Sequence, residues 1–144
     1  MADITIKRGT TGNCLRVDLR HATTGVGLTG LTYQSAGLLV STIANNEATP
    51  VTYQADATST METIATLGTF ATPTADFCRF REIDATNHPG LYELQLVNGR
   101  FSVASSRELV ITISGAANLM ARTYVVGLVA YDMQDTVRMG LTAL

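Results

Sequence analysis

Apolar and polar side chains alternate with a period of two in several short stretches of this chain. In residues 14–20, and again in residues 108–114, every second side chain is apolar. Successive side chains of a β-strand point to opposite faces, so this pattern predicts a strand that buries one face and exposes the other. We therefore expect Leu15, Val17 and Leu19 to point inward from the first of these strands.

Seven further stretches are short, apolar or rich in β-branched residues, and Gly, Pro, Asn, Asp and Ser separate them. They are residues 4–7, 38–44, 51–55, 62–67, 77–83, 91–97 and 123–131. The Asn45-Asn46 dipeptide is expected to join two of them as a pair. The last stretch is apolar on both faces, which predicts a central strand that is covered on both sides.

This order of strands predicts an all-β fold, an antiparallel β-sandwich of immunoglobulin-like or jelly-roll-like type over residues 1–131. Pro89 and Gly90 stand between the strands predicted at 77–83 and 91–97. Proline presets φ for the second position of a turn, and glycine accepts the positive φ that a type II turn needs next. We expect these two residues to form the structural turn of a hairpin, with Gly90 at positive φ.

The period changes in residues 132–144. Apolar residues there fall at helical spacing and Asp132 can cap a helix, which predicts a short C-terminal helix or extension. A helix of this length is marginal in water by itself, so its apolar stripe must be buried against something. We expect residues 132–144 to be a docking or oligomerisation segment, and the candidate docking residues are Met133, Val137, Arg138, Leu141 and Leu144.

Composition indicates a surface with few charges. Charged residues make up 15% of the 144 residues, below the ~25% usual for soluble domains, and the net charge is −2. Neutral Thr and Ala side chains cost little to desolvate, which favours a protein that is largely covered by neighbours. The balance of charge gives no basic footprint for a nucleic-acid partner.

No motif predicts a catalytic or metal site. Residues 25–30 match G-x-G-x-x-G, but no helical pattern follows them, as a dinucleotide site would need. His21 and His88 lack the spacing of zinc ligands. Glu82 and Asp84 fall on one side of a predicted strand, yet the chain has no Trp to help bind a sugar beside them. We expect no enzymatic activity, no cofactor and no metal.

Two observations bear on location. No stretch of ~18 consecutive apolar residues exists, and the first nine residues lack a signal sequence. We expect a protein that is made in the cytoplasm, stays soluble and has no membrane partner. Cys14 and Cys78 are expected to be reduced, buried thiols.

Three blocks of this sequence resemble a module common in structural proteins of tailed bacteriophages and prophages. They are G-L-T-G-L-T-Y-Q-S-A-G-L at 27–38, C-R-F-R-E-I-D-A-T-N-H-P-G-L-Y-E-L-Q-L at 78–96 and I-S-G-A-A-N-L at 113–119. The resemblance implies a β-sandwich at the N-terminus of a fibre or another virion protein. Residues 132–144 are similar to the joint where longer members continue into fibrous sequence. The chain is then either a short stand-alone member or the ordered head of a longer one.

Together these observations predict a non-enzymatic virion protein that is made in the bacterial host cytoplasm. It would decorate the capsid or anchor a fibre or collar. The expected partners are other virion proteins, namely major capsid, portal or collar, or fibre subunits, and further copies of itself. The alternative is a glycan-binding β-sandwich for host-surface adhesion, which would need an exposed row of aromatic side chains.

Overall fold

Two β-sheets pack against each other in the computed structural model, which describes residues 3–56, 59–132 and 134–137. One sheet has five strands in the order β1 (Ile4–Lys7), β9 (Arg122–Val129), β8 (Glu108–Ser114), β3 (Leu39–Ala44) and β4 (Val51–Gln54). The other has four, in the order β2 (Leu15–Asp18), β7 (His88–Gln95), β6 (Cys78–Asp84) and β5 (Met61–Glu62). A 3₁₀ turn, η1 (Asn98–Phe101), follows β7.

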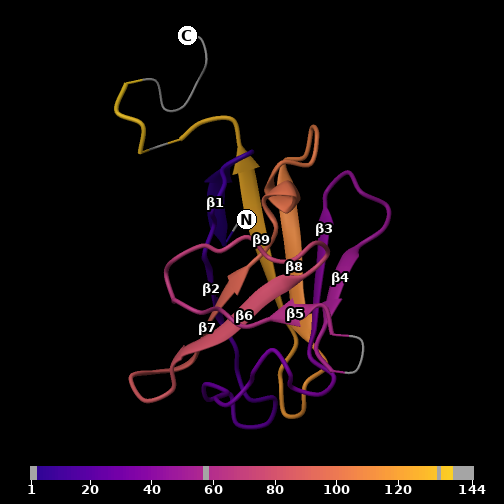
Figure 1. Cartoon of the computed structure of the whole chain (residues 1–144), viewed down its shortest axis with the longest axis vertical. Coiled ribbons are helices and arrows are strands. Elements are labelled where there is room, and N and C mark those ends of the chain that lie inside the picture. The colour runs from indigo at the N-terminus through magenta and orange to yellow at the C-terminus, as the bar shows by residue number, and fades with distance from the viewer. Residues whose placement is uncertain (1–2, 57–58, 133, 138–144) are drawn as a thin grey trace.

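The all-β sandwich is therefore confirmed, and its strands cross in Figure 1, where β6 and β7 run obliquely to β8 and β9. Both sheets are mixed rather than purely antiparallel. β1 pairs with β9 in parallel and β5 pairs with β6 in parallel, while the other pairs are antiparallel. The two parallel pairs lie at sheet edges, where the chain enters a sheet from a distant part of the sequence.

The core lies between the sheets and follows the alternation in the sequence. Leu15, Val17 and Leu19 are buried, as predicted, and every second residue of β8 is fully buried. Phe80 and Tyr92, from neighbouring strands, stack with ring centroids 4.9 Å apart. Each fully buried aliphatic or aromatic side chain contributes roughly 1.5–3 kcal/mol, so these alternating positions supply most of the driving force for folding.

Two strand predictions were wrong in part. The stretch 62–67 pairs only through β5, at Met61 and Glu62, and then leaves the sheet. β9 is central in its sheet, but only one of its faces is buried. Its apolar outward residues are half-exposed, because no second layer of the described chain is packed over them.

The hairpin between β6 and β7 reverses earlier than predicted. Residues 85–87 form the turn, and Pro89 and Gly90 already belong to β7. Gly90 has φ of 88°, so the positive φ is confirmed, but it sits at an irregularity in the pairing of β6 with β7. A side chain there would come within 2.5 Å of the Leu19 carbonyl oxygen and 2.7 Å of the Gly27 Cα. Close backbone approach, and not the turn, requires this glycine.

The predicted C-terminal helix does not form in the residues that are described after β9. The Asp132 carboxylate accepts the Gln134 N–H at 2.9 Å, and the Asp135 carboxylate accepts the Val137 N–H at 2.9 Å. Such local bonds from Asp side chains compete with helical ones, and they produce turns here. This extension projects from the sandwich in Figure 1. The other candidate docking residues, Met133, Arg138, Leu141 and Leu144, lie outside the described residues.

Candidate interaction surface

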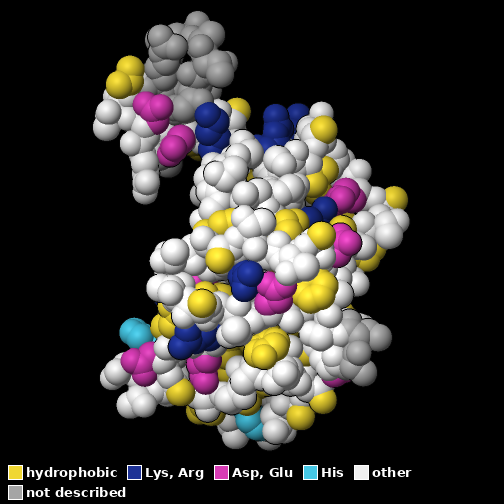
Figure 2. All heavy atoms as spheres, in the orientation of Figure 1, with side chains coloured by type: hydrophobic (Ala, Val, Ile, Leu, Met, Phe, Trp, Pro, Cys, Tyr) yellow, Lys and Arg dark blue, Asp and Glu magenta, His cyan; other side chains and the backbone are white. Residues whose placement is uncertain are grey.

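The outer face of the four-stranded sheet carries charged side chains in registered rows. Arg16, Glu93 and Arg81 stand opposite one another across β2, β7 and β6. In the next row Arg79 stands between Gln95 and Glu62, and it forms an ion pair with Glu62 at 2.9 Å. Opposite charges that lie opposite each other on one face stabilise a sheet. On the side displayed in Figure 2, blue and magenta side chains likewise lie beside one another.

These charges hold a segment of the chain, residues 63–77, over the same sheet. The Arg79 guanidinium donates to the Thr63 carbonyl at 2.9 Å and to the Ala71 carbonyl at 3.0 Å. Arg81 donates to the carbonyls of Ile64 and Ala65, at 2.9 and 3.0 Å. Carbonyls of an irregular segment would otherwise need water, so the two arginines fix its path.

Glu93 and Gln95, which belong to β7, also bind residues 63–77, and both side chains are fully buried. The Glu93 carboxylate accepts the Gly68 N–H at 2.9 Å and the Gln95 amide at 2.8 Å, and pairs with Arg16 at 3.0 Å. Gln95 also donates to the Thr69 carbonyl at 3.1 Å. These charged side chains therefore bind the protein's own backbone and one another.

The outer face of the five-stranded sheet differs. It lacks a charged side chain over β9, β8, β3 and β4 apart from Glu108 at one end. We call the uncharged part the neutral face, and its residues point outward from these strands: Leu39, Ser41, Ile43, Thr52, Gln54, Val110, Thr112, Ser114, Thr123 and Val125. Three of them are exposed and the other seven are half-buried. In the described parts of the chain, no segment anchors over this face as residues 63–77 do over the other.

Cross-strand register sorts the neutral face into rows of like chemistry. Ile43, Val110 and Val125 stand side by side across β3, β8 and β9 and form an aliphatic row. The next row is hydroxylic, and in it Thr112 and Thr123 share a hydrogen bond between their hydroxyl oxygens at 3.1 Å. Hydroxyls that already have a partner lose less when water is removed. The face can therefore be covered at low cost.

Charges border the neutral face at one end and along the β1 side. Glu108 stands opposite Gly127, and Lys7 stands opposite Val129. The Asp3 carboxylate is occupied by the Val125 N–H, which it accepts at 2.7 Å. The border thus has both signs of charge.

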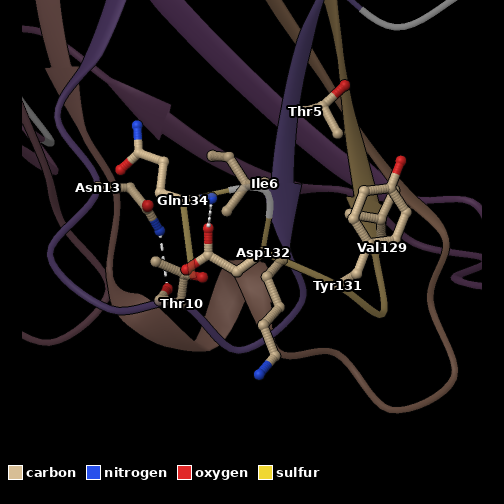
Figure 3. A pocket seen from close by; sticks show the side chains of 9 residues that line it. Thr5, Ile6, Thr10, Asn13, Val129, Tyr131, Asp132 and Gln134 are labelled. Atoms are coloured by element: carbon tan, nitrogen blue, oxygen red, sulfur yellow. Dashed lines mark hydrogen bonds between the residues drawn. The ribbon is translucent and has the colours of Figure 1, made fainter. Parts of the chain in front are cut away.

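A hollow of about 420 Å³ lies beside the edge strand β1, between that strand and the start of the C-terminal extension. Figure 3 shows its lining, which includes Thr5, Thr10, Asn13, Tyr131 and Asp132. The Asn13 amide is already bonded to the Thr10 carbonyl at 2.8 Å. A smaller hollow of about 260 Å³ lies near Phe80 and Glu82. The polar lining of the first hollow combines the hydroxyls of Thr5 and Thr10, two amide side chains, and the charged groups of Lys7 and Asp132.

The carboxylates considered for a sugar site hold loops instead. Asp84 accepts the N–H groups of Thr86 and Asn87, both at 3.0 Å, and these bonds lower its pKa. Glu82 accepts the Gly30 N–H at 3.1 Å. Both groups are therefore fixed as acceptors of backbone hydrogen bonds.

The histidines and the glycine-rich stretch also lie in loops or at a strand end. His21 Nδ1 accepts the Thr23 N–H at 3.1 Å, and His88 stands opposite Asp84 where β7 begins. Residues 25–30 do not open a helix; Gly27 bridges to Arg20 instead. Within the described ranges, no three His, Cys, Asp or Glu side chains gather as metal ligands would. Cys14 and Cys78 are free thiols, Cys78 buried and Cys14 half-buried, and burial raises the pKa of both.

The tyrosines belong mainly to the core. Tyr53, Tyr92 and Tyr124 are buried, and burial raises the pKa of Tyr53 and of Tyr92 to about 12. The Tyr92 hydroxyl donates to the Leu28 carbonyl at 2.7 Å, and Tyr124 bonds to the backbone of Asp18 in the opposite sheet. Of the other two tyrosines, Tyr33 is half-buried and Tyr131 is 38% exposed.

Sequence reasoning predicted a neutral, Thr-rich surface but did not locate it. The signal was the outward set of positions in 108–114 and 123–129, where Val110, Thr112, Thr123 and Val125 replace the usual charges. The hollow beside β1 had no signal in the sequence, because it depends on how the extension leaves β9.

Comparison with protein-family models, with curated proteins and with solved structures gave no match for this chain. No helix in the part of the chain that the structure describes has the length and apolar character to cross a bilayer.

Proposed function

We propose that this protein is a non-enzymatic structural protein of a bacteriophage particle, where it decorates the capsid or anchors a fibre or collar through protein–protein contacts. The observation that carries the proposal is the contrast between the two outer faces. Charged side chains of one sheet bind residues 63–77, while none of the segments that the structure describes is anchored over the neutral face of the other sheet. A charge-free centre in which the Thr112 and Thr123 hydroxyls bond to each other is what the core of a protein interface needs.

The C-terminal extension would provide a second contact. Val137 is 82% exposed in the described structure, and the extension starts beside the hollow next to β1. An exposed aliphatic side chain on a projecting segment gains free energy when a partner buries it. Residues 132–144 are accordingly proposed as the segment that docks on a neighbouring virion protein.

A glycan-binding role on the same sandwich has less support. Sugar binding by stacking needs exposed aromatic faces, and three of the five tyrosines are buried with their rings in the core. A glycan array would separate this alternative from the proposal, because a purely structural protein would bind none of the glycans.

The direct test is mass spectrometry of purified particles, with the copy number of this protein measured against the major capsid protein. The proposal predicts a fixed, symmetric stoichiometry that withstands washing. Because the neutral face has few charges, binding should change little between about 0.05 M and about 0.5 M salt, a range over which screening weakens charged contacts. Loss from the particle during washing, or presence only in infected-cell lysate, would contradict the proposal.

A further inference from the structure

The neutral face has the properties of a surface that packs against its own copy. It is the outward side of four adjacent strands, with an aliphatic row beside a hydroxylic row. Sheets pack face to face about 10 Å apart when such rows interdigitate. A second copy of this chain would bring an identical set of rows to the contact.

Charge favours this occupant over a strongly acidic or basic protein. A two-fold contact places a surface against itself, so every charge at its centre would meet a like charge and repel. The centre of the neutral face has no charge, and the charged residues at its border, Lys7, Glu108 and Asp3, include both signs. A partner of strong charge would find nothing there to pair with.

The size of the face is sufficient for a dimer of modest affinity. Four strands at ~4.8 Å spacing, each about six residues long at ~3.3 Å per residue, give a flat footprint of roughly 380 Å² per copy. Accessible area exceeds this flat footprint because the face is corrugated by side chains. The flat footprints of two copies sum to roughly 760 Å², and corrugation raises the buried area toward ~1,000 Å², which is the size of a weak interface and below the ~1,200 Å² of stable ones.

We infer that the protein forms a two-fold dimer through the neutral face, with Thr112 of each copy near the two-fold axis. Thr112 lies on β8, the middle strand of the five, in the middle of the hydroxylic row. Any face-to-face packing centred on the sheet brings the two copies of this residue together. The inference rests on the proposed use of this face for protein contacts and names the partner.

The test is sedimentation of the full chain between roughly 1 and 100 µM, a range that captures dimers of micromolar affinity. The wild-type protein should approach twice the 15.3 kDa chain mass. Thr112→Lys should raise the dissociation constant by ~100-fold or more, because two ammonium groups would face each other in a water-poor contact. The matched control is Thr86→Lys, which makes the same change in charge at an exposed position in the β6–β7 turn; it should leave the dimer intact.

A charge-swap mixture separates loss of contact from loss of fold. Thr112→Lys and Thr112→Glu should each be monomeric, and an equimolar mixture should recover the dimer because opposite charges then meet. If either variant melts well below wild type, Thr123→Lys and Thr123→Glu replace them, since Thr123 is an exposed neighbour in the same row.

Three results would overturn the inference: a wild-type monomer throughout the concentration range, a Thr112→Lys variant that still dimerises, or a mixture that stays monomeric. Binding to particles is measured in parallel to keep the two proposals apart. A monomer that binds particles would remove the dimer and leave the virion role. A dimer that never binds particles would support the dimer and remove the virion role.

Discussion

The buried carboxylate of Glu93 offers the sharpest test of how the sandwich holds residues 63–77. Replacing it by Gln keeps the shape but removes the charge that receives the Gly68 N–H, the Gln95 amide and the Arg16 guanidinium. The new side-chain NH₂ group must also face a donor, because donors surround the carboxylate. At least one buried N–H then loses its acceptor.

The magnitude follows from these contacts. A hydrogen bond to a charged group contributes ~1.5–3 kcal/mol, against ~0.5–1.5 kcal/mol for a neutral one. Two such bonds are weakened, and Arg16 adds little because its side chain is 46% exposed and solvent screens the pair. We expect Glu93→Gln to lower the free energy of unfolding by ~2–4 kcal/mol, part of the range for breaking a buried ionic contact.

The assay is urea denaturation followed by circular dichroism, combined with hydrogen exchange of the Gly68 amide. Exchange across residues 63–77 should accelerate more than exchange in β8, because the lost contacts are local to that segment. Alkylation gives an independent readout. The Glu93 charge raises the pKa of Cys14, so the variant should lower that pKa and speed modification of the Cys14 thiol.

Arg16→Ala is the matched control, since it removes the exposed half of the ion pair and leaves the backbone acceptor in place. Its cost should stay below ~1 kcal/mol. A Glu93→Gln variant that loses less than the Arg16→Ala control, with unchanged exchange at Gly68, would refute the view that this carboxylate anchors the segment.

Three further predictions follow from other contacts. Gly90→Val should destabilise the fold by at least ~3 kcal/mol, measured by thermal melting, because it combines positive φ with a backbone clash; an unchanged melting temperature would remove the requirement for glycine there. Tyr124→Phe should lower the free energy of unfolding, measured by urea titration, by ~1–3 kcal/mol, because the N–H and the carbonyl of Asp18 lose the hydroxyl that both of them bind. A loss below ~0.5 kcal/mol would mean that water replaces the hydroxyl. Hydrogen bonds from Arg100 lower the pKa of Glu47 in the folded protein. The ionised Glu47 therefore stabilises the fold fully above its unfolded-state pKa, near 4.5. This stabilisation is lost as the pH falls through the lower folded-state pKa. The stability difference between wild type and Glu47→Gln should therefore shrink on acidification from pH ~6 to ~3, and a difference that stays constant over that range would contradict the assignment.

Alternation in the sequence predicted the strands whose two faces differ. β8 matches residues 108–114 because a buried aliphatic residue occupies every second position. β7 was harder, since Glu93 and Gln95 have the composition of a solvent face and yet are fully buried. Their burial comes from residues 63–77, a segment without a regular pattern, and the Gly68 N–H that Glu93 accepts lies 25 residues away in the sequence.

The sequence predicted the chemical character of the candidate surface but not its position in the fold. Low charge and abundant threonine indicated a neutral face, but the register that groups Thr112 with Thr123, and Val110 with Val125, depends on pairing between strands. The helical spacing of residues 132–144 was misleading over its described part. Local bonds from Asp132 and Asp135 favour turns there, and periodicity alone does not account for them.

The measurement that tests the central claim most directly is thiol labelling of Thr112→Cys in the assembled particle and in the free protein at roughly 0.1 µM, a concentration at which a dimer of micromolar affinity is dissociated. The peptide that contains residue 112 is quantified by mass spectrometry, and Thr86→Cys serves as the exposed reference. If the neutral face is an interface, assembly should slow labelling at residue 112 by ~10-fold or more, as expected for a site removed from solvent, while residue 86 keeps its rate. Equal labelling of residue 112 in both states would show that the neutral face stays open to solvent and would contradict the account.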